Sequence, residues 1–320
     1  MSETDAVGPP PGRTTKNWAV IGGEGWRIVE PDESVVFFSF GPDGKVQLEL
    51  AVIRDIGTGS PELLGWLAKV VDDACAYRRD IRPNHPGKMA QFGINTGPWH
   101  ARSLGWAKSF TRKLSDDAKA AKDEEVIGAS SIVWSLLTYC MPVPITEHIE
   151  KVLAEEGLPR AASANVPPGT TFTIKRVSRD PENPLPDLTF KYERGPPEVY
   201  LSRAYVAHSH FDKNYAKWAL TLMVKREVAD SCTMPDGGAS FVDVNLKVIV
   251  RQATGTGIAF QPDHMHGTTE AHGATSWSIS HVFSQRVVDM IRDASDAVLR
   301  GIFPERGAGE GNPANPAKAE

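Results

Sequence analysis

The sequence predicts one α+β domain in which helices come first and an antiparallel β-sandwich or barrel follows. Its 320 residues, 41% of them apolar, are enough to bury a sizeable core. Apolar residues recur at helical spacing in the first half, whereas short strand-like segments separated by turn residues fill 188–288. A polar, proline-rich connection at 179–187 marks the change between the two patterns.

The first half is expected to support the β-rich half. Between 17 and 55 apolar residues alternate with polar ones, and VVFFSF and VQLELAVI predict two strands around the turn GPDG. Residues 61–79 predict an amphipathic helix that begins at Pro61. Further helical segments are predicted near 113–121, 130–140 and 146–157.

The second half contains strand-like segments and a last helix. The predicted strands are LTFKYE, EVYLSRAYVAH, WALTLMVKREV, SFVDVNLKVIV, GIAF and SWSISHVFS, and the helix is VVDMIRDASDAVLRGIF. We therefore predict a single domain at 16–304, with a support region at 16–187, a β core at 188–288 and a closing helix at 288–304, between disordered tails at 1–15 and 305–320.

Charge and cysteine content favour a soluble intracellular protein, cytoplasmic or nuclear. A net charge of −5 provides no global attraction to nucleic acid or to an anionic membrane. The three cysteines lie far apart, which argues against a disulfide framework and against a zinc knuckle. The uncharged segment 128–146 contains Ser, Thr and Pro, and favours a buried core helix ending at Pro142 over a membrane span.

The pair His210 and Asp212 lies at the end of the apolar strand YLSRAYVAH. Residues two apart on a strand project to the same side, as two ligands of one metal must. A further His from a neighbouring strand would complete two histidines and one carboxylate on one face of an octahedron, which is the ligand set of non-haem Fe(II) oxygenases.

This spacing alone is weak evidence, because His148-Ile149-Glu150 has it too. That second pair falls on a predicted helix, where residues two apart point in nearly opposite directions. We interpret it as a solvated helix face.

The order of the features after His210 resembles the Fe(II)/2-oxoglutarate-dependent dioxygenases. The matching features are His210-Phe211-Asp212 with Asn214, PDGGASFVDV, GTGIAF and His266-Gly267-Thr268. The resemblance covers roughly 195–288 and looks most like the fungal branch related to the TET/JBP nucleobase oxygenases. It implies a double-stranded β-helix, a jelly-roll or cupin-like core with N-terminal helices as its support. It also implies Fe(II), 2-oxoglutarate as cosubstrate, and O₂.

The resemblance leaves two histidines as candidates for the distal metal ligand. His264 and His266 are two residues apart and share a strand face. We favour His266, since His-Gly-Thr after a short loop is similar to the family's third ligand. We therefore predict His210, Asp212 and His266 as the metal-binding and catalytic residues, and expect His208 to be a hydrogen-bonded core histidine.

The chain departs from the family where the distal carboxylate of 2-oxoglutarate should bind. Relatives place an Arg or Lys after the distal His, but here no such residue occurs before Arg286. Ser276, Ser278 and Ser280 lie on the strand face where that cation would point, and Ser278 is our predicted cosubstrate contact.

Some branches supply the cation from the strand after the HxD motif instead. Lys225 has the same strand parity as Thr221 and Met223, and it is our first candidate for the anchor, with Arg286 the second. Asn214 would either contact the cosubstrate or substrate, or cap the turn after the strand.

Basic residues in the helical half suggest a possible partner surface. RRDIRPNHPGK at 78–88 and KSFTRK at 108–113 place cations near aromatic residues. On an oxygenase of flipped bases they would hold the phosphate backbone. The acidic net charge favours a solvated face, so small molecules or peptides are expected substrates at least as much as nucleic acid.

We therefore predict a dioxygenase that oxidises a C–H bond of an organic substrate while 2-oxoglutarate is converted to succinate and CO₂. By the same resemblance, a carboxylate at Asp212 favours hydroxylation over halogenation. One alternative is a non-catalytic cupin-like binding module, which the missing Arg after the distal His would support. The other is a cupin metalloenzyme that uses His208, His210 and His266 without 2-oxoglutarate.

Overall fold

The computed structural model describes residues 25–303, except 99, 108–109, 167–171, 175–181, 184–187, 191–193, 233 and 235–236. The predicted tails at 1–15 and 305–320, and most of the connection at 179–187, lie outside the described residues.

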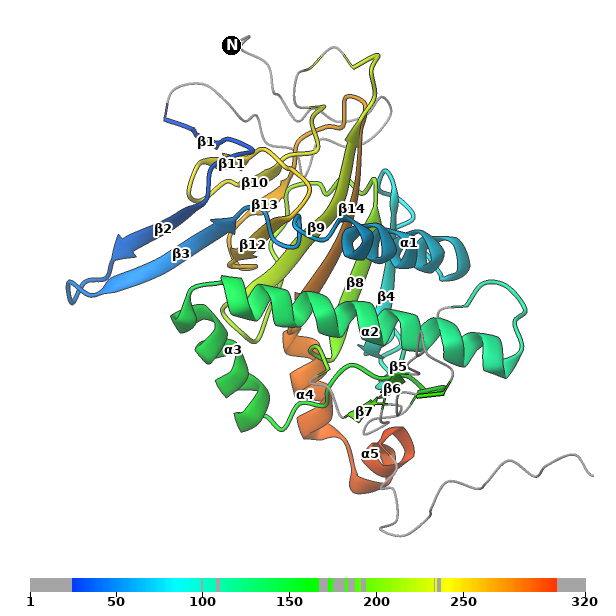
Figure 1. The fold of residues 1–320 in the computed structure, drawn as a ribbon. Coiled ribbons are helices and arrows are strands. Elements are labelled where there is room, and N and C mark those ends of the chain that lie inside the picture. Colours follow the sequence, from blue (N-terminus) through cyan, green and yellow to red (C-terminus); the bar gives the residue numbers. More distant parts are fainter. Residues whose placement is uncertain are drawn as a thin grey trace, which may run out of the picture.

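Most described strands belong to two sheets (Figure 1). In spatial order the large sheet contains β2 (Val35–Phe40), β3 (Val46–Ile53), β12 (Thr256–Phe260), β9 (Ala219–Val228), β14 (Ala274–Val282), β8 (Glu198–Arg203), β4 (Lys88–Asn95) and β5 (Gly105–Trp106). The small sheet contains β1 (Arg27–Val29), β11 (Val248–Val250), β10 (Phe241–Asp243) and β13 (His266–Thr268). Pairing is antiparallel in both sheets, except between β1 and β11.

From β8 onward the chain alternates between the two sheets. After β8 in the large sheet, His210 forms a bridge to His266 at the edge of the small sheet, and β9 returns to the large sheet. β10 and β11 lie in the small sheet, β12 in the large, β13 in the small and β14 in the large. This alternation is the topology of a double-stranded β-helix, so the predicted α+β fold with such a core is confirmed.

Helices cover the outer face of the large sheet. The described helices are α1 (Pro61–Tyr77), α2 (Asp116–Cys140), α3 (Val143–Glu155), α4 (Gln285–Asp293) and α5 (Asp296–Ile302). α1 and α2 lie across β8, β9 and β14 (Figure 1). Their buried faces and the outer face of the sheet share the largest apolar cluster, which includes Leu67, Val71, Trp134 and Leu137. This layer fixes the strands from which the site is built.

A smaller apolar cluster closes one side of the space between the sheets. It joins β3 and β12 of the large sheet to β10 and β11 of the small sheet, through Leu50, Val52, Phe241, Val248, Val250 and Ile258. The remaining interior, beside β8, β9 and β14, has polar walls and forms the cavity described below.

Several elements differ from the predicted ones. The strand β4 was not predicted, and it joins the large sheet beside β8. SFVDVNLKVIV is a hairpin of β10 and β11, because Lys247 adopts a left-handed φ of 54° in the turn. The two helices predicted near 113–121 and 130–140 are one helix, α2, whose N-terminus is capped by Ser115.

Two further differences concern the ends of the β core. The described part of LTFKYE is β7 (Leu188–Phe190), which pairs with β6 (Phe172–Ile174) in a separate two-stranded sheet and not in the barrel. The predicted closing helix is interrupted at Ala294, where α4 ends in an extended conformation before α5 begins.

The segment predicted as a buried core helix behaves as expected. It forms the second half of α2, with Val133, Trp134 and Leu137 buried, and the helix ends at Cys140 just before Pro142. None of the described helices has the length and apolar character needed to cross a membrane.

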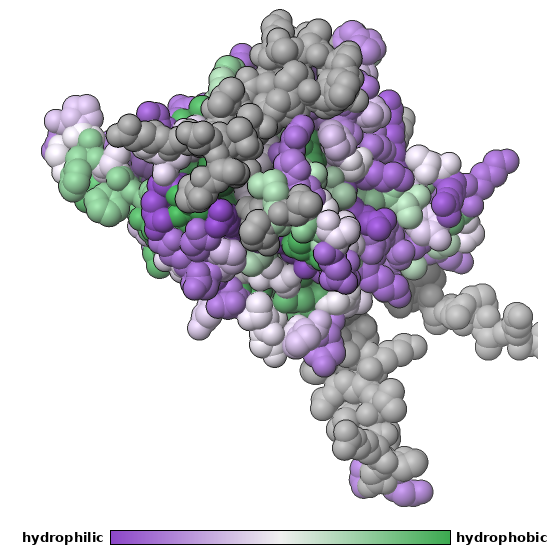
Figure 2. Space-filling model, turned by 90° about the horizontal axis from the view of Figure 1, so that it is seen from above, coloured by the Kyte–Doolittle hydropathy of each residue, from purple (hydrophilic) through white to green (hydrophobic). Residues whose placement is uncertain are grey.

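The β2–β3 hairpin projects away from the barrel. Phe38, Phe40 and Val46 are exposed there, and this apolar tip is visible at the left of Figure 2. The hairpin tip does not line the cavity.

Candidate metal centre

The chain brings His210 and Asp212 to the small sheet immediately after β8. Ala204 adopts a left-handed φ of 50°, which ends β8 and directs the chain away from the large sheet. The backbone of His210 then pairs with that of His266 through two hydrogen bonds of 2.9 and 2.8 Å. The N–H of Asp212 donates to the carbonyl of Pro262 at 2.7 Å. His210 therefore lies in an isolated bridge rather than in the continuous strand that the sequence suggested.

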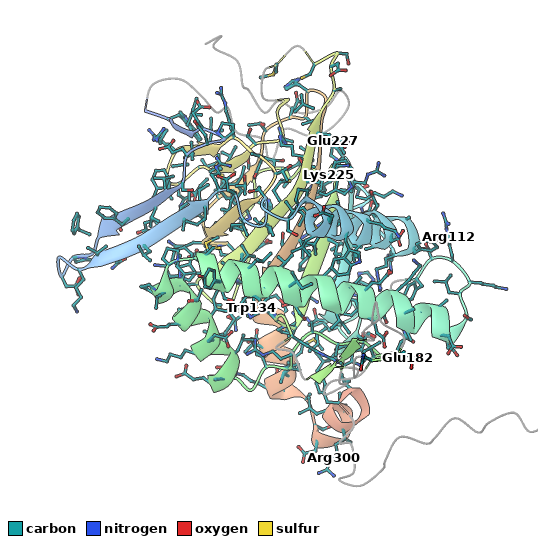
Figure 3. The ribbon with its side chains drawn as sticks, viewed as in Figure 1. Arg112, Trp134, Glu182, Lys225, Glu227 and Arg300 are labelled. Atoms are coloured by element: carbon teal, nitrogen blue, oxygen red, sulfur yellow. The ribbon has the colours of Figure 1, made fainter. Side chains whose placement is uncertain are left out.

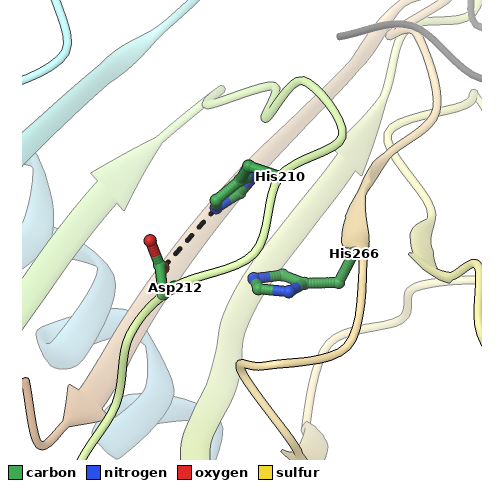
Figure 4. Close-up of side chains that lie close together, drawn as sticks. All are labelled: His210, Asp212 and His266. Atoms are coloured by element: carbon green, nitrogen blue, oxygen red, sulfur yellow. Dashed lines mark ion pairs between the residues drawn. The ribbon is translucent and has the colours of Figure 1, made fainter.

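Three potential ligands converge at this point (Figure 4). One ligand atom each from His210, Asp212 and His266 lies within 4.8 Å of the other two. The Nε2 atom of His210 is 3.6 Å from Oδ2 of Asp212, and the two imidazole rings are 4.5 Å apart between centroids. A single ion can therefore contact all three groups. The structure thus brings the three predicted residues together, and their role as metal ligands stays a prediction.

Backbone carbonyls orient both imidazole rings. Nδ1 of His210 lies 2.6 Å from the carbonyl oxygen of His208, and Nδ1 of His266 lies 2.8 Å from that of His264. Each Nδ1 therefore donates its proton to a carbonyl, so that in the neutral form of each ring Nε2 carries the lone pair. This second contact is the usual partner of a metal-binding histidine, because it fixes the tautomer and the ring plane.

Burial and mutual charge set the protonation of the three groups. Burial lowers the pKa of His266, and the nearby His210 lowers it further. Burial also acts to lower the pKa of His210, but the hydrogen bond and the charge of Asp212 outweigh it, and this pKa is raised. Burial would raise the pKa of Asp212, yet His210 and His266 hold it below its usual value. Asp212 is thus an anion at neutral pH, as a metal ligand must be.

The neighbouring histidines have other partners. Nδ1 of His264 is 2.9 Å from Oδ2 of Asp243, a fully buried carboxylate of β10. The ring of His208 stacks on that of His85, with 4.4 Å between centroids. Of the described residues, only His210, Asp212 and His266 form a cluster with this geometry. The position of His264 therefore favours His266 as the distal ligand.

The three groups face a cavity of about 1200 Å³ between the two sheets. Small polar side chains of the large sheet form one wall, namely Ser202, Thr221, Ser276, Ser278 and Ser280. Ser278 and Ser202 are hydrogen-bonded at 2.7 Å, and Ser280 donates to Thr221 at 2.8 Å. The expected common face of the three β14 serines is therefore present, and it points into the cavity.

Lys225 lies on the other face of the sheet, so the parity argument for it is wrong. The pairing of β9 with β14 shifts between Trp277 and Ser278, and this bulge reverses the parity beyond Met223. The ammonium of Lys225 pairs with Glu227 at 2.6 Å and lies 4.8 Å from the centre of the Trp277 ring (Figure 3). Trp277 in turn donates to Asp72 of α1, so Lys225 is on the helix-covered side and does not line the cavity.

The same bulge turns Arg226 toward the interior. Its Nη1 donates to Oγ of Ser276 at 2.9 Å, and its Nη2 donates to the carbonyl of Gly238 beside the small sheet. The guanidinium therefore links β14 to the segment before β10, and it contacts the cavity lining through Ser276, although Arg226 itself is not a lining residue. Sequence reasoning missed this residue because a bulge of one residue leaves no periodic signal, although a second cation beside Lys225 was visible in the sequence.

Arg286 lines the opposite end of the cavity. Its Nη2 donates to the carbonyl of Gly97 at 3.2 Å. Beside it the buried carboxylate of Glu198 accepts hydrogen bonds from the N–H and the hydroxyl of Ser284, at 2.7 and 3.0 Å. Burial raises the pKa of Glu198 to about 7, in spite of these hydrogen bonds. This end of the cavity therefore has a cation and a carboxyl group that is partly protonated at neutral pH.

Asn214 is engaged by the turn that follows Asp212. Its Nδ2 donates to the carbonyls of Ala216 and Trp218, and its Oδ1 accepts from the N–H of Phe283. All three contacts are to the backbone, which supports the turn-capping alternative even though the residue borders the cavity.

The basic segment 78–88 is divided between core and cavity. The guanidinium of Arg78 is buried against Asp123 at 2.5 Å and serves the core. Arg79 and Arg82 line the cavity. In the other basic segment, Arg112 lies over the ring of Tyr77 and does not line the cavity, while Lys108 is outside the described residues.

Comparisons with known proteins give neighbours in fold only. No family model matches the chain, and neither does any curated protein. Among solved structures, NgTET1 in complex with 5mC DNA is similar at 11% identity over 82% of this chain and 84% of that one, with a TM-score of 0.46. The viral collagen prolyl hydroxylase of Paramecium Bursaria Chlorella virus-1, in its 2OG complex, has 13% identity over 76% and 97%, with a TM-score of 0.31.

A third neighbour is an oxidoreductase of the 2OG-Fe(II) oxygenase family from Burkholderia pseudomallei, at 15% identity over 28% of this chain and 43% of that one, with a TM-score of 0.23. At such identities the similarity concerns the fold alone.

Proposed function

We propose that the protein is an Fe(II)- and 2-oxoglutarate-dependent oxygenase that oxidises a C–H bond of an organic substrate. The observation that carries this proposal is the convergence of His210, Asp212 and His266 on one point at the wall of a cavity of about 1200 Å³. Two neutral imidazoles and a carboxylate are a donor set that suits Fe(II) and leaves coordination positions open.

The fit of a metal ion rests on the ligands' own contacts. Both Nδ1 atoms are held by carbonyl oxygens, so both Nε2 atoms are available to an ion. Bound Fe(II) with 2-oxoglutarate would supply the oxidising chemistry, with O₂ as oxidant and succinate and CO₂ as products.

The role of the protein chain is to position and to desolvate. His210, Asp212 and His266 would hold the ion at the wall of the cavity, where a cosubstrate and a substrate can reach it. The hydroxyl-lined wall of β14, with Ser276, Ser278 and Ser280, provides hydrogen bonds without fixed charge.

Arg226 is the residue we propose for the distal carboxylate of 2-oxoglutarate, in place of Lys225. Its guanidinium donates a hydrogen bond to Ser276, which lines the cavity. Ser276 of β14 occupies the strand position where relatives of the predicted family carry their cation. The guanidinium of Arg226 would supply the positive charge at that position from the neighbouring strand β9. A planar guanidinium can hold a carboxylate through two parallel hydrogen bonds.

Arg286 is less suited to this role by its distance from Ser276. Ser284 and Ser276 are eight residues apart along the β14 region, which corresponds to roughly 25 Å of extended chain. Arg286 therefore lines the cavity at the end away from Ser276. The proposal retains Ser278 as a hydrogen-bonding contact on the wall between the two ends.

The decisive experiment measures succinate formed from 2-oxoglutarate by protein reconstituted with Fe(II), in the wild type and in Asp212→Ala. We expect turnover in the wild type, even without added substrate, and its loss in the variant, together with loss of bound iron. Glu150→Ala is a matched control, because it removes the carboxylate of the other His-x-acid pair, which is on α3 and pairs with Arg160. Absence of both turnover and bound iron in the wild type would rule out the proposed function and favour a non-catalytic binding module.

A further inference from the structure

The cavity extends beyond the metal centre toward β4 and β5. Residues of this extension include Asn95, His100 and Trp106, together with the segment that precedes β4. The cosubstrate site proposed above uses the opposite, inner end near Ser276. The extension is thus the part of the cavity left for the substrate.

Two arginines of the segment before β4 line this extension. Arg79 and Arg82 are both exposed, and neither forms an ion pair with any residue that the structure describes. Lys213, next to the metal ligand Asp212, lines the cavity as well. The mouth of the cavity therefore has three cations available to a ligand.

The position of Arg82 is fixed by its own backbone. Oδ1 of Asp80 accepts hydrogen bonds from the N–H of Arg82 at 3.0 Å and from the N–H of Met89 at 3.3 Å. Asp80 thus holds the turn and does not form an ion pair with the guanidinium of Arg82. The turn presents this guanidinium at the cavity near the metal ligands.

The carboxylates on the same cavity do not neutralise these cations. Asp212 belongs to the metal centre, Asp80 holds the turn, and the carboxyl of Glu198 is buried among hydrogen bonds from Ser284. Burial raises the pKa of Tyr200 well above its usual value, and the positive charge of Arg82 opposes that rise, which places this charge close to the cavity wall. The substrate end of the cavity is accordingly electropositive in a protein of net charge −5.

We propose that the substrate carries an oxyanionic group, a carboxylate or a phosphate, which Arg82 binds with the support of Arg79, while a C–H bond of the same molecule faces the metal centre. This inference rests on the proposed function for the role of the metal, but the anion site itself does not require a bound metal. Trp106, on the same extension, offers an apolar surface for the part of the molecule between the anion and the reacting carbon.

A single anion fits the surface better than a nucleic-acid backbone does. Tracking a phosphate backbone takes a row of cations along an extended surface. Here Arg78 of the same segment is buried against Asp123, and Arg112 is turned to the ring of Tyr77. What remains is a compact group of cations at the edge of one cavity.

The test uses the metal-free full-length protein and three small probes that share one ring, phenyl phosphate, benzoate and benzamide. Their affinities are measured by titration calorimetry. We expect at least one of the two anions to bind about tenfold more tightly than neutral benzamide. Arg82→Gln should remove that advantage and leave the affinity for benzamide unchanged. The tighter of the two anions identifies the group as phosphate or carboxylate.

Two control variants make the result specific. Arg112→Gln alters an arginine outside the cavity, whose position is labelled in Figure 3, and should change no affinity. Arg226→Gln alters the proposed cosubstrate anchor and should also leave the anion affinities unchanged. Equal binding of benzamide and the anions, or loss of anion binding in Arg226→Gln but not in Arg82→Gln, would overturn the proposal.

A fourth arm separates this proposal from its main alternative and from the proposed function. The proposal is wrong if a single-stranded oligonucleotide binds while phenyl phosphate and benzoate do not, and if Arg112→Gln weakens the binding of the oligonucleotide. The surface would then be a binding site for a nucleic-acid backbone. Asp212→Ala should bind the anions at least as tightly as the wild type, because it removes a negative charge that interacts with Arg82. A wild type that binds the anions but no iron would contradict the proposed function while supporting the anion site.

Discussion

At the scale of single residues, the contacts of each histidine decide its role. His264 and His266 are two apart and equivalent by sequence, but one faces the carboxylate of Asp243 and the other faces His210 and Asp212. Periodicity identified both candidates and could not separate them, because the difference lies in partners that come from β10 and from the segment after β8.

This difference leads to a prediction for metal binding. His266→Ala should weaken binding of Mn(II), a redox-inert stand-in for Fe(II), by at least about tenfold, since it removes one of three ligands. His264→Ala should retain Mn(II) binding but lower the free energy of unfolding by about 1–3 kcal/mol, because it leaves the buried Asp243 without its imidazole partner. Calorimetric titration and urea denaturation of both variants measure the two effects, and the reverse pattern would assign His264 as the ligand.

The two neighbouring cations of β9 provide a second residue-scale prediction. Arg226→Gln should raise the KM for 2-oxoglutarate by roughly tenfold to a hundredfold, because a desolvated guanidinium–carboxylate pair is lost. Lys225→Gln should leave KM within about twofold, since that ammonium is paired with Glu227 on the helix side. A large effect of Lys225→Gln with none of Arg226→Gln would restore the original assignment.

At the scale of elements, irregular backbone accounts for most of the differences from the sequence-based picture. Three features follow plain periodic patterns and lie where they were expected. They are the amphipathic helix α1, the two strands β2 and β3 on either side of the turn GPDG, and the strand GIAF. β4 was missed because KMAQFGIN is buried on both faces and has no alternation to detect. The bulge in β9 was missed for a similar reason, because the pairing with β14 determines it and the local sequence does not. It changes the proposed cosubstrate anchor from Lys225 to Arg226.

Two glycines offer an element-scale test of this backbone control. Gly93 in β4 has a φ of +94°, and an added Cβ would lie 1.9 Å from the carbonyl oxygen of Pro197. Gly93→Ala should therefore lower the free energy of unfolding by roughly 2–4 kcal/mol. Gly65→Ala is the matched control, since Gly65 is exposed in α1 with open space around its Cβ position, and this change should stabilise by about 0.5–1 kcal/mol. Urea denaturation of both variants measures the difference in sign.

At the scale of the whole molecule, the order of helical and strand-like patterns was sufficient to predict the architecture. Composition and periodicity do not tell that the strands alternate between two sheets. That expectation came from the family resemblance. The surface properties of the cavity could not be derived in this way, because its lining comes from distant segments, including β4, β8, β14 and the chain before α4.

A buried histidine makes the stability of the whole fold depend on pH. His281 of β14 is fully buried against α2, where its Nε2 lies 3.1 Å from Oγ of Ser130. Burial lowers its pKa from 6.5 to about 3. The native state therefore binds fewer protons than the unfolded state between these values, and the free energy of unfolding should fall as the pH drops from about 6.5 toward about 3, by up to about 5 kcal/mol.

The contribution of this one residue can be isolated. His281→Gln should show a smaller loss of stability between about pH 6.5 and about pH 4 than the wild type, because it removes the titrating group. His272→Gln, which changes an exposed histidine, should follow the wild type. Urea denaturation across this range measures the three slopes, and parallel curves for wild type and His281→Gln would refute the assignment.

The pairing of Arg226 with Ser276 has a consequence for how such sites can be recognised. The two residues are register partners on adjacent strands, so a positive charge at either position occupies nearly the same volume of the interior. A binding feature of this kind is a property of the sheet as a two-dimensional lattice, in which moving one step sideways is as short as moving along the chain. A linear sequence motif describes positions along the chain only. It will therefore miss proteins in which the cation comes from the neighbouring strand.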